Sequence, residues 1–107
     1  MIVRIDARRL TDAAGLHAAM SEAFGFPATY GKNLDALIDC LTEIDNPAAA
    51  MSRVHVFPGQ VLLLAVDHVD TASKVQVKAL TDAAAFVNWR RMEKRQPPVL
   101  AVAYETA

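Results

Sequence analysis

VLLLAV, residues 61–66, contains no polar residue and is bounded by Pro58-Gly59 before it and by Asp67 after it. A short apolar run between such signals is typical of a central strand of a parallel sheet that is covered on both faces. Parallel neighbours are joined by crossover connections, which usually contain a helix. We therefore expect an α/β fold built around this strand.

Two further strands are expected, one toward each end of the chain. Residues 2–5 are rich in β-branched side chains, and residues 99–104 follow Pro97-Pro98, which cannot continue a helix. Helical segments separate all three strands, so right-handed crossovers should join them. The prediction is one domain over residues 1–107, with a three-stranded parallel sheet packed with three or four helices in a single layer arrangement.

The first two helices have clear local signals. Thr11 or Asp12 can cap the first helix, and Gly25 supplies its stop. Asn33 is a good N-cap for the second, which is expected over residues 34–44.

The third helical region covers about residues 71–96, either unbroken or interrupted near Lys78 with a new cap at Thr81 or Asp82. Its apolar side is expected to comprise Val75, Leu80, Ala83, Ala84 and Val87. Residues 45–60 are the least regular part of the chain, and they form either a loose insertion or a short extra strand.

Composition limits the classes of function. The net charge of -1 gives no overall bias toward nucleic acid or an acidic membrane. The single cysteine, Cys40, excludes an intrachain disulfide and a cysteine-based zinc site, as in a reducing cytosol. The sequence shows no signal peptide and no membrane span, so we expect a cytoplasmic protein, and no cofactor is indicated.

The second predicted helix has two distinct sides. Asp35, Asp39 and Glu43 follow one another at four-residue intervals and therefore form a line of carboxylates. Each like-charge pair at this spacing destabilises a helix by about 0.2–0.5 kcal/mol. The line is either a solvated face or a binding surface, and periodicity alone does not choose between them. The opposite sector is apolar and comprises Leu34, Leu37, Cys40, Leu41 and Ile44.

The run FPATYGKNLDALIDCLTEI, residues 26–44, resembles the signature segment of the barstar family. That segment has a proline, an aromatic-Gly-x-Asn loop and then Leu-Asp-Ala-Leu-x-Asp-Cys-Leu. The matching positions are Pro27, Tyr30, Gly31, Asn33, Leu34, Asp35, Ala36, Leu37, Asp39, Cys40, Leu41 and Thr42.

The resemblance implies a three-stranded parallel sheet with four helices, and inhibition of a barnase-type ribonuclease. Acids at the positions of Asp35 and Asp39 would meet the cations that normally hold RNA phosphate, as charge-assisted hydrogen bonds allow. The expected partner is a basic microbial ribonuclease in a 1:1 complex, and the free protein is expected to be a monomer. The implied partner-binding residues are Thr29, Tyr30, Gly31, Asn33, Asp35, Ile38, Asp39, Thr42 and Glu43.

The chain also departs from the family archetype. Thr29, Ile38 and Ile44 stand where the archetype has aromatic residues. Lys32 replaces a loop acid, and Glu43 replaces a glycine at the helix end. The acidic contact made by the archetype's last helix has no clear counterpart, because residues 86–91 read FVNWRR.

Other functions have weaker support. Arg90, Arg91, Lys94 and Arg95 beside Trp89 invite a nucleic-acid interpretation, although compensation of the helix dipole and solubility are favoured. The histidines His17, His55 and His68 have no ligand spacing, and Cys40 is expected to be buried and inert. No catalytic motif is present, so an enzyme is not expected. The alternative function is a barstar-fold module that regulates another basic protein or RNA.

Overall fold

A computed structural model describes residues 1–106 and shows a parallel sheet of three strands in the order β1-β2-β3. The strands are β1 (Ile2–Asp6), β2 (Leu62–Val69) and β3 (Leu100–Thr106). Leu63 of β2 is in register with Ile2 on one side and with Ala101 on the other. The expected α/β fold and the central place of the VLLLAV run are therefore confirmed.

Three α-helices connect the strands: α1 (Ala13–Phe24), α2 (Leu34–Thr42) and α3 (Lys74–Glu93). Two short 3-10 helices are added, η1 (Ala7–Arg9) and η2 (Pro47–Ala49). Asp12 rather than Thr11 caps α1, since its carboxylate accepts a hydrogen bond from the Gly15 amide at 2.7 Å. Gly25 ends α1 in the left-handed conformation, with φ 66°, as expected. None of these helices is both long and apolar enough to cross a membrane.

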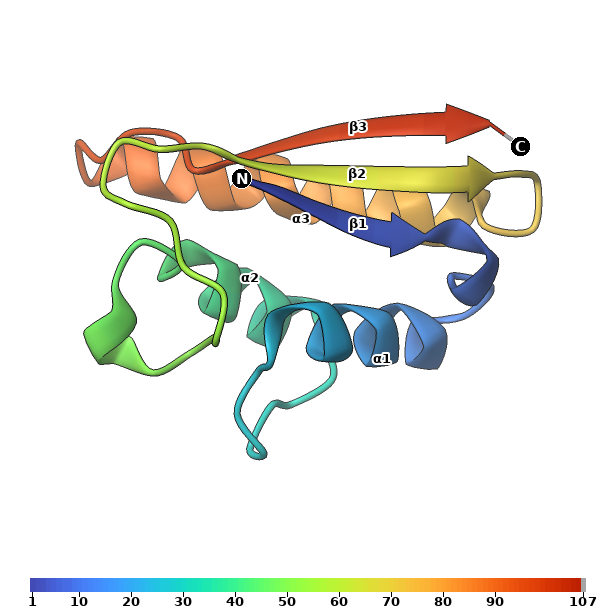
Figure 1. Ribbon diagram of the computed structural model, residues 1–107, viewed down its shortest axis with the longest axis horizontal. Coiled ribbons are helices and arrows are strands. Elements are labelled where there is room, and N and C mark those ends of the chain that lie inside the picture. The colour runs from blue at the N-terminus through green and yellow to red at the C-terminus, as the bar shows by residue number, and fades with distance from the viewer. Residues whose placement is uncertain (107) are drawn as a thin grey trace.

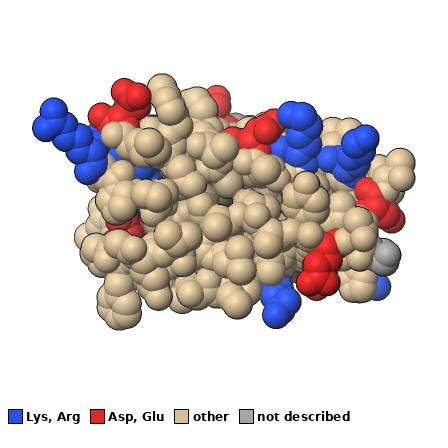
Figure 2. All heavy atoms as spheres, turned by 90° about the horizontal axis from the view of Figure 1, so that it is seen from above, with Lys and Arg blue, Asp and Glu red and all other residues tan. Residues whose placement is uncertain are grey.

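The helices gather on one side of the sheet, with α3 along β2 and β3 and with α1 and α2 beside it (Figure 1). Along β2 the residues Leu62, Leu64 and Val66 are buried, whereas Leu63 and Ala65 between them are only half-buried. The expectation that β2 is covered on both faces is therefore wrong, because both crossover connections return over the same face. Seen from the β3 side, the molecule shows a broad uncharged area with charged side chains toward its margins (Figure 2).

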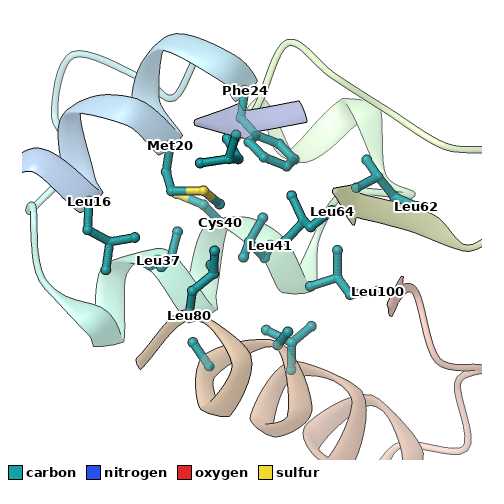
Figure 3. Packing of buried hydrophobic residues seen from close by; sticks show 14 of the residues in the cluster. Leu16, Met20, Phe24, Leu37, Cys40, Leu41, Leu62, Leu64, Leu80 and Leu100 are labelled. Carbon is teal, nitrogen blue, oxygen red and sulfur yellow. The ribbon is translucent and has the colours of Figure 1, made fainter. Parts of the chain in front are cut away.

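The core lies between this covered face and the three helices (Figure 3). Its members include Leu16, Met20 and Phe24 of α1, Leu37, Cys40 and Leu41 of α2, Leu62 and Leu64 of β2, Leu80 of α3, and Leu100 of β3. Because α2 contributes one side to this core, its opposite side is held toward solvent.

Helix α3 is unbroken, so the break considered near Lys78 is absent. Thr81 is not a cap, because its hydroxyl donates to the Val77 carbonyl within the helix at 2.9 Å. Val75 is 73% exposed and Val77 takes the expected core position in its place. Val75 precedes Leu80 by five residues, which corresponds to about 500° around a helix and places the two on different sides.

Residues 45–60 are neither a loose insertion nor a strand. The Phe24 carbonyl at the end of α1 accepts hydrogen bonds from the Ser52 hydroxyl at 2.9 Å and the Arg53 amide at 2.8 Å. The Val56 amide donates to the Ile44 carbonyl at 3.1 Å. The segment thus satisfies carbonyls that helix ends leave without partners, and its Val56 belongs to the hydrophobic core.

Candidate functional site

The loop before α2 and the first turn of α2 form one hydrogen-bonded unit. The Asn33 side chain accepts from the Ala36 amide at 2.8 Å, and its own amide donates to the Gly31 carbonyl at 3.4 Å. A Cβ added at Gly31 would lie 3.3 Å from the Asn33 side chain and 3.4 Å from Ala36. The small residue therefore lets the loop pass close to the helix start, and the loop is shaped before any partner arrives.

The nine residues implied by the family resemblance fall into two groups. Seven are exposed or half-buried: Thr29, Gly31, Asn33, Asp35, Ile38, Asp39 and Glu43. The other two, Tyr30 and Thr42, are buried at 9% and 6% exposure. In the free protein their side chains therefore expose little surface and pack into the fold beneath the candidate surface.

Tyr30 is fixed by a buried hydrogen bond to α1. Its hydroxyl oxygen lies 2.6 Å from Nδ1 of His17, and its ring packs against Phe26 with centroids 4.7 Å apart. Burial lowers the pKa of His17 and raises the pKa of Tyr30. At neutral pH Nδ1 of the neutral imidazole can therefore accept a hydrogen bond from the Tyr30 hydroxyl, which keeps its proton. This bond ties the loop of the candidate surface to the core.

Thr42 performs a similar task at the other end of α2. Its hydroxyl donates to the Ile38 carbonyl at 2.6 Å within the helix, and Glu43 follows as the C-cap. The helix therefore ends two residues before the expected limit at residue 44. Ile44 nevertheless remains completely buried, as its place on the apolar side predicts.

In the line of carboxylates on α2, Asp35 and Asp39 are exposed and Glu43 is half-buried, and Asp39 forms an ion pair within the chain. Nη1 of Arg90 in α3 donates to Oδ1 of Asp39 at 2.8 Å, and the two side chains are 37% and 54% exposed. Among residues 1–106, Oδ2 of Asp39 has no hydrogen-bond partner, and Asp35 has no ion pair. Asp39 thus has one oxygen held in place and one oxygen open to solvent.

A second ion pair between the same parts of the chain is buried. Arg91 is 2% exposed and binds Asp45 through two hydrogen bonds of 2.7 and 3.0 Å. It also donates to the Thr42 and Pro97 carbonyls at 2.8 and 2.9 Å. The guanidinium of Arg91 lowers the pKa of Asp45. Arg91 is therefore a structural clamp at the end of α2.

These two pairs change the interpretation of the basic end of α3. The predicted roles in dipole compensation and solubility are wrong for Arg90 and Arg91, because Arg90 binds Asp39 of α2 and Arg91 binds Asp45 of the segment after it. The pairs also offset the charges of Asp39 and Asp45, two of the four acids in residues 28–46. Counting charges in neighbouring residues cannot identify these ion pairs, because the two partners are 51 and 46 residues apart in the sequence.

A hollow of about 450 Å³ lies between α2 and α3 beside the Asp39 pair. Asp39 and Glu43 are among its acidic lining residues, and Arg90 and Lys94 are its cations. The described residues bring together no group of three His, Cys, Asp or Glu side chains that could hold a metal ion. Cys40 is 2% exposed on the core side of α2, and burial raises the pKa of its thiol.

Comparison with models of protein families gives a match over nearly the whole chain. A family model described as Barstar (barnase inhibitor) matches residues 1–102 of the chain. The match covers all three helices and the entire candidate surface. No curated protein matches the chain.

Proposed function

Because the chain belongs to the barstar family, we propose that it inhibits a barnase-type ribonuclease by placing the carboxylates of α2 in the enzyme's phosphate-binding cleft. The loop of residues 29–33 and the exposed side of α2 form the contact surface. We also propose that the protein has no catalytic activity of its own and acts in the cytoplasm as a monomer that forms a 1:1 complex.

The observation that carries this proposal is the state of Asp39. Arg90 holds one carboxylate oxygen at 2.8 Å while the other remains open, so the group is oriented but still able to accept a hydrogen bond. Asp35 lies one helical turn away on the same side and has no competing ion pair among the described residues. A phosphate group likewise offers several anionic oxygens to arginine, lysine and histidine side chains.

The rigid backing of this surface favours tight binding. Asn33 caps α2, Tyr30 is bound to His17, and Arg91 clamps the far end of the helix. Less conformational entropy is lost when a preformed surface binds, and the clustered charge accelerates encounter with a basic protein.

RNA binding through the end of α3 is less well supported. Arg91 is buried and Arg90 is engaged by Asp39, which leaves only Lys94 and Arg95 as unpaired cations of that cluster within residues 1–106. Nucleic-acid binding generally depends on several contacts between cations and phosphates, and two exposed cations can make only a few of them.

The test is inhibition of RNA cleavage by purified barnase-type ribonucleases. We expect stoichiometric inhibition, and we expect Asp39→Ala to weaken binding by about 30-fold or more, because it leaves the enzyme's buried cations unpaired. Asp82→Ala is the matched control, since Asp82 is also an exposed helical acid in an ion pair, with Lys78 at 2.7 Å. Failure to inhibit any enzyme of a representative panel, or equal binding by Asp39→Ala, would contradict the proposal.

A further inference from the structure

Two aromatic side chains on α3 are exposed to solvent. Phe86 is 47% exposed and Trp89 is 55% exposed. Their rings lie against each other with centroids 5.5 Å apart and planes inclined by 45°. Neither belongs to the core side of α3, which is formed by Val77, Leu80, Ala83, Ala84 and Val87 together with Arg91. The pair therefore forms a small apolar surface that the fold itself does not require.

This aromatic pair borders the carboxylate line. Phe86 precedes Arg90 by four residues, so the two side chains lie on the same side of α3, one turn apart. Arg90 in turn reaches across to Asp39 of α2. Going around α3 away from α2, Arg90 comes first, Phe86 next and Trp89 after it, at about 100° per residue. Arg90 is thus the side chain that stands between the apolar surface and the carboxylate line.

We propose that Phe86 and Trp89 extend the binding surface across α3 and receive basic side chains at the rim of the ribonuclease's cleft. This inference rests on the proposed function, and it deepens that function by adding a second contact element. An aromatic ring can hold an arginine or lysine over its face and can also cover the aliphatic stem of that side chain. The partner implied is a protein whose cationic cleft has further arginine or lysine residues at its edge.

Two observations favour this occupant over others. The carboxylate surface has no exposed aromatic residue of its own, since Ile38 is half-buried aliphatic and Tyr30 is buried. Binding hot spots are enriched in tryptophan, tyrosine and arginine, and Phe86 with Trp89 is an exposed aromatic pair on the same helix as Arg90. Asp82 lies one turn before Phe86 and Glu93 one turn after Trp89, so two acids border the pair along α3.

The experiment compares Phe86→Ala and Trp89→Ala with two controls in titrations against an inhibited ribonuclease. Val75→Ala removes an exposed apolar group from α3 eleven residues before Phe86, about 16 Å away. Tyr104→Ala removes an exposed ring, 58% accessible, from β3. We expect each α3 aromatic variant to weaken binding about tenfold or more, and each control to change it less than about twofold.

A spectroscopic measurement on the otherwise unaltered protein makes the test independent of folding effects. Trp89 is the only tryptophan in the chain, so incorporation of 5-fluorotryptophan places one fluorine label at this surface. The fluorine resonance should shift on addition of unlabelled ribonuclease and lose its sensitivity to a soluble paramagnetic quencher.

The possible results separate the two proposals. Loss of binding in Asp39→Ala with normal binding in both aromatic variants, and an accessible label in the complex, would overturn this inference and leave the proposed function standing. Indifference of binding to Asp39 and Trp89 alike would overturn both. A dimer in sedimentation that dissociates in Trp89→Ala would show that a second copy covers the pair, and this too would overturn the inference.

Discussion

Arg90 of α3 donates a hydrogen bond at 2.8 Å to Asp39 of α2, so the carboxylate proposed as the main anchor already has a cation beside it in the free protein. Both side chains are more than a third exposed, and ion pairs of this kind contribute only about 0–1 kcal/mol to stability. A desolvated arginine of a partner can therefore compete for Asp39 at small cost. Arg90 orients the anchor and at the same time reduces the negative field around it.

Replacing Arg90 with glutamine should therefore improve binding. We expect Arg90→Gln to bind a basic ribonuclease several-fold more tightly, chiefly through a faster association rate at low salt, with unfolding free energy changed by less than about 1 kcal/mol. Stopped-flow association at two ionic strengths measures the effect. Lys78→Gln removes the same charge from another surface pair, with Asp82. Weaker binding by Arg90→Gln would show instead that Arg90 touches an acid on the partner.

The fold could be predicted largely from local signals. The apolar run of β2, the Asn33 N-cap and the Gly25 C-cap are each determined by a few neighbouring residues. The structure has all three at the predicted positions. The prediction that helices cover both faces of β2 was wrong. An apolar run is also found in a central strand with one uncovered face, where neighbouring strands shield its outer side chains, so the run alone does not distinguish the two cases. Which face the crossover helices cover depends on the whole chain.

The site was predictable only in part. The acidic line on α2 follows from helix periodicity, and its outward orientation agrees with the exposure of Asp35 and Asp39. The Asp39 and Asp45 ion pairs were missed because they join residues about half the chain apart. The packing of α2 against α3 brings these partners together, and no spacing rule along one helix contains that information.

Arg91 should be far more sensitive to substitution than Arg90. It is 2% exposed, binds Asp45 through two hydrogen bonds and satisfies two carbonyls as well. We expect Asp45→Ala to lower the unfolding free energy by about 3–5 kcal/mol, since it leaves this guanidinium charged and buried without its acid. Arg91→Lys should also be destabilising, because an ammonium cannot reproduce the fork geometry. Urea unfolding monitored by circular dichroism gives the values. A loss below 1 kcal/mol in both variants would show that water replaces the pair.

Acid should remove the stability that the Arg91 pair provides. The pKa of Asp45 is lowered from its ordinary value of 3.8, chiefly by the hydrogen bond from Arg91. The folded state therefore binds this proton less readily than the unfolded state, and the contribution is complete above the unfolded pKa and declines as pH falls through the folded one. The stability difference between wild type and Asp45→Asn should be largest near pH 7 and shrink below about pH 4. A constant difference across that range would contradict the assignment.

The His17–Tyr30 bond predicts a second pH effect, nearer neutrality. Burial lowers the pKa of His17 below its ordinary value of 6.5, so the unfolded state takes up the proton first. The native state should therefore be fully stabilised above pH 6.5 and lose stability as pH falls from there toward the folded pKa. Unfolding of wild type and of His17→Gln, measured from pH 8 to pH 5 at about half-unit steps, should show this slope only in the wild type.

The hydroxyl of Tyr30 should itself contribute to stability. Tyr30→Phe removes the 2.6 Å contact and leaves the buried Nδ1 of His17 without its partner, which costs about 1–3 kcal/mol. Tyr104→Phe is the control, because that ring is 58% exposed on β3. Equal melting temperatures for the two variants would show that the hydrogen bond contributes nothing net.

The thiol of Cys40 should report on the orientation of α2. Its 2% exposure and raised pKa both suppress the reactive thiolate, so labelling by a disulfide reagent should be much slower in the native protein than in urea. Native labelling at the rate of a free thiol would mean that α2 is rotated, and the acidic side would then have to be reassigned.

The two ends of the carboxylate line should differ in their importance for binding. Asp39 lies in the middle of α2, whereas Glu43, which lines the same hollow against α3, is the C-cap and already accepts a hydrogen bond from Asn46 at 3.3 Å. Removing an acid at the centre of the contact leaves the partner's cations unpaired, but an acid at the helix end lies at the margin of the contact. We therefore expect Asp39→Ala to lose more affinity than Glu43→Ala, and binding of both to weaken with added salt. Titrations of both variants at two ionic strengths test this order. Equal losses, or binding that ignores salt, would mean that the line is a solvated face and that the chain keeps the barstar fold without its inhibitory function.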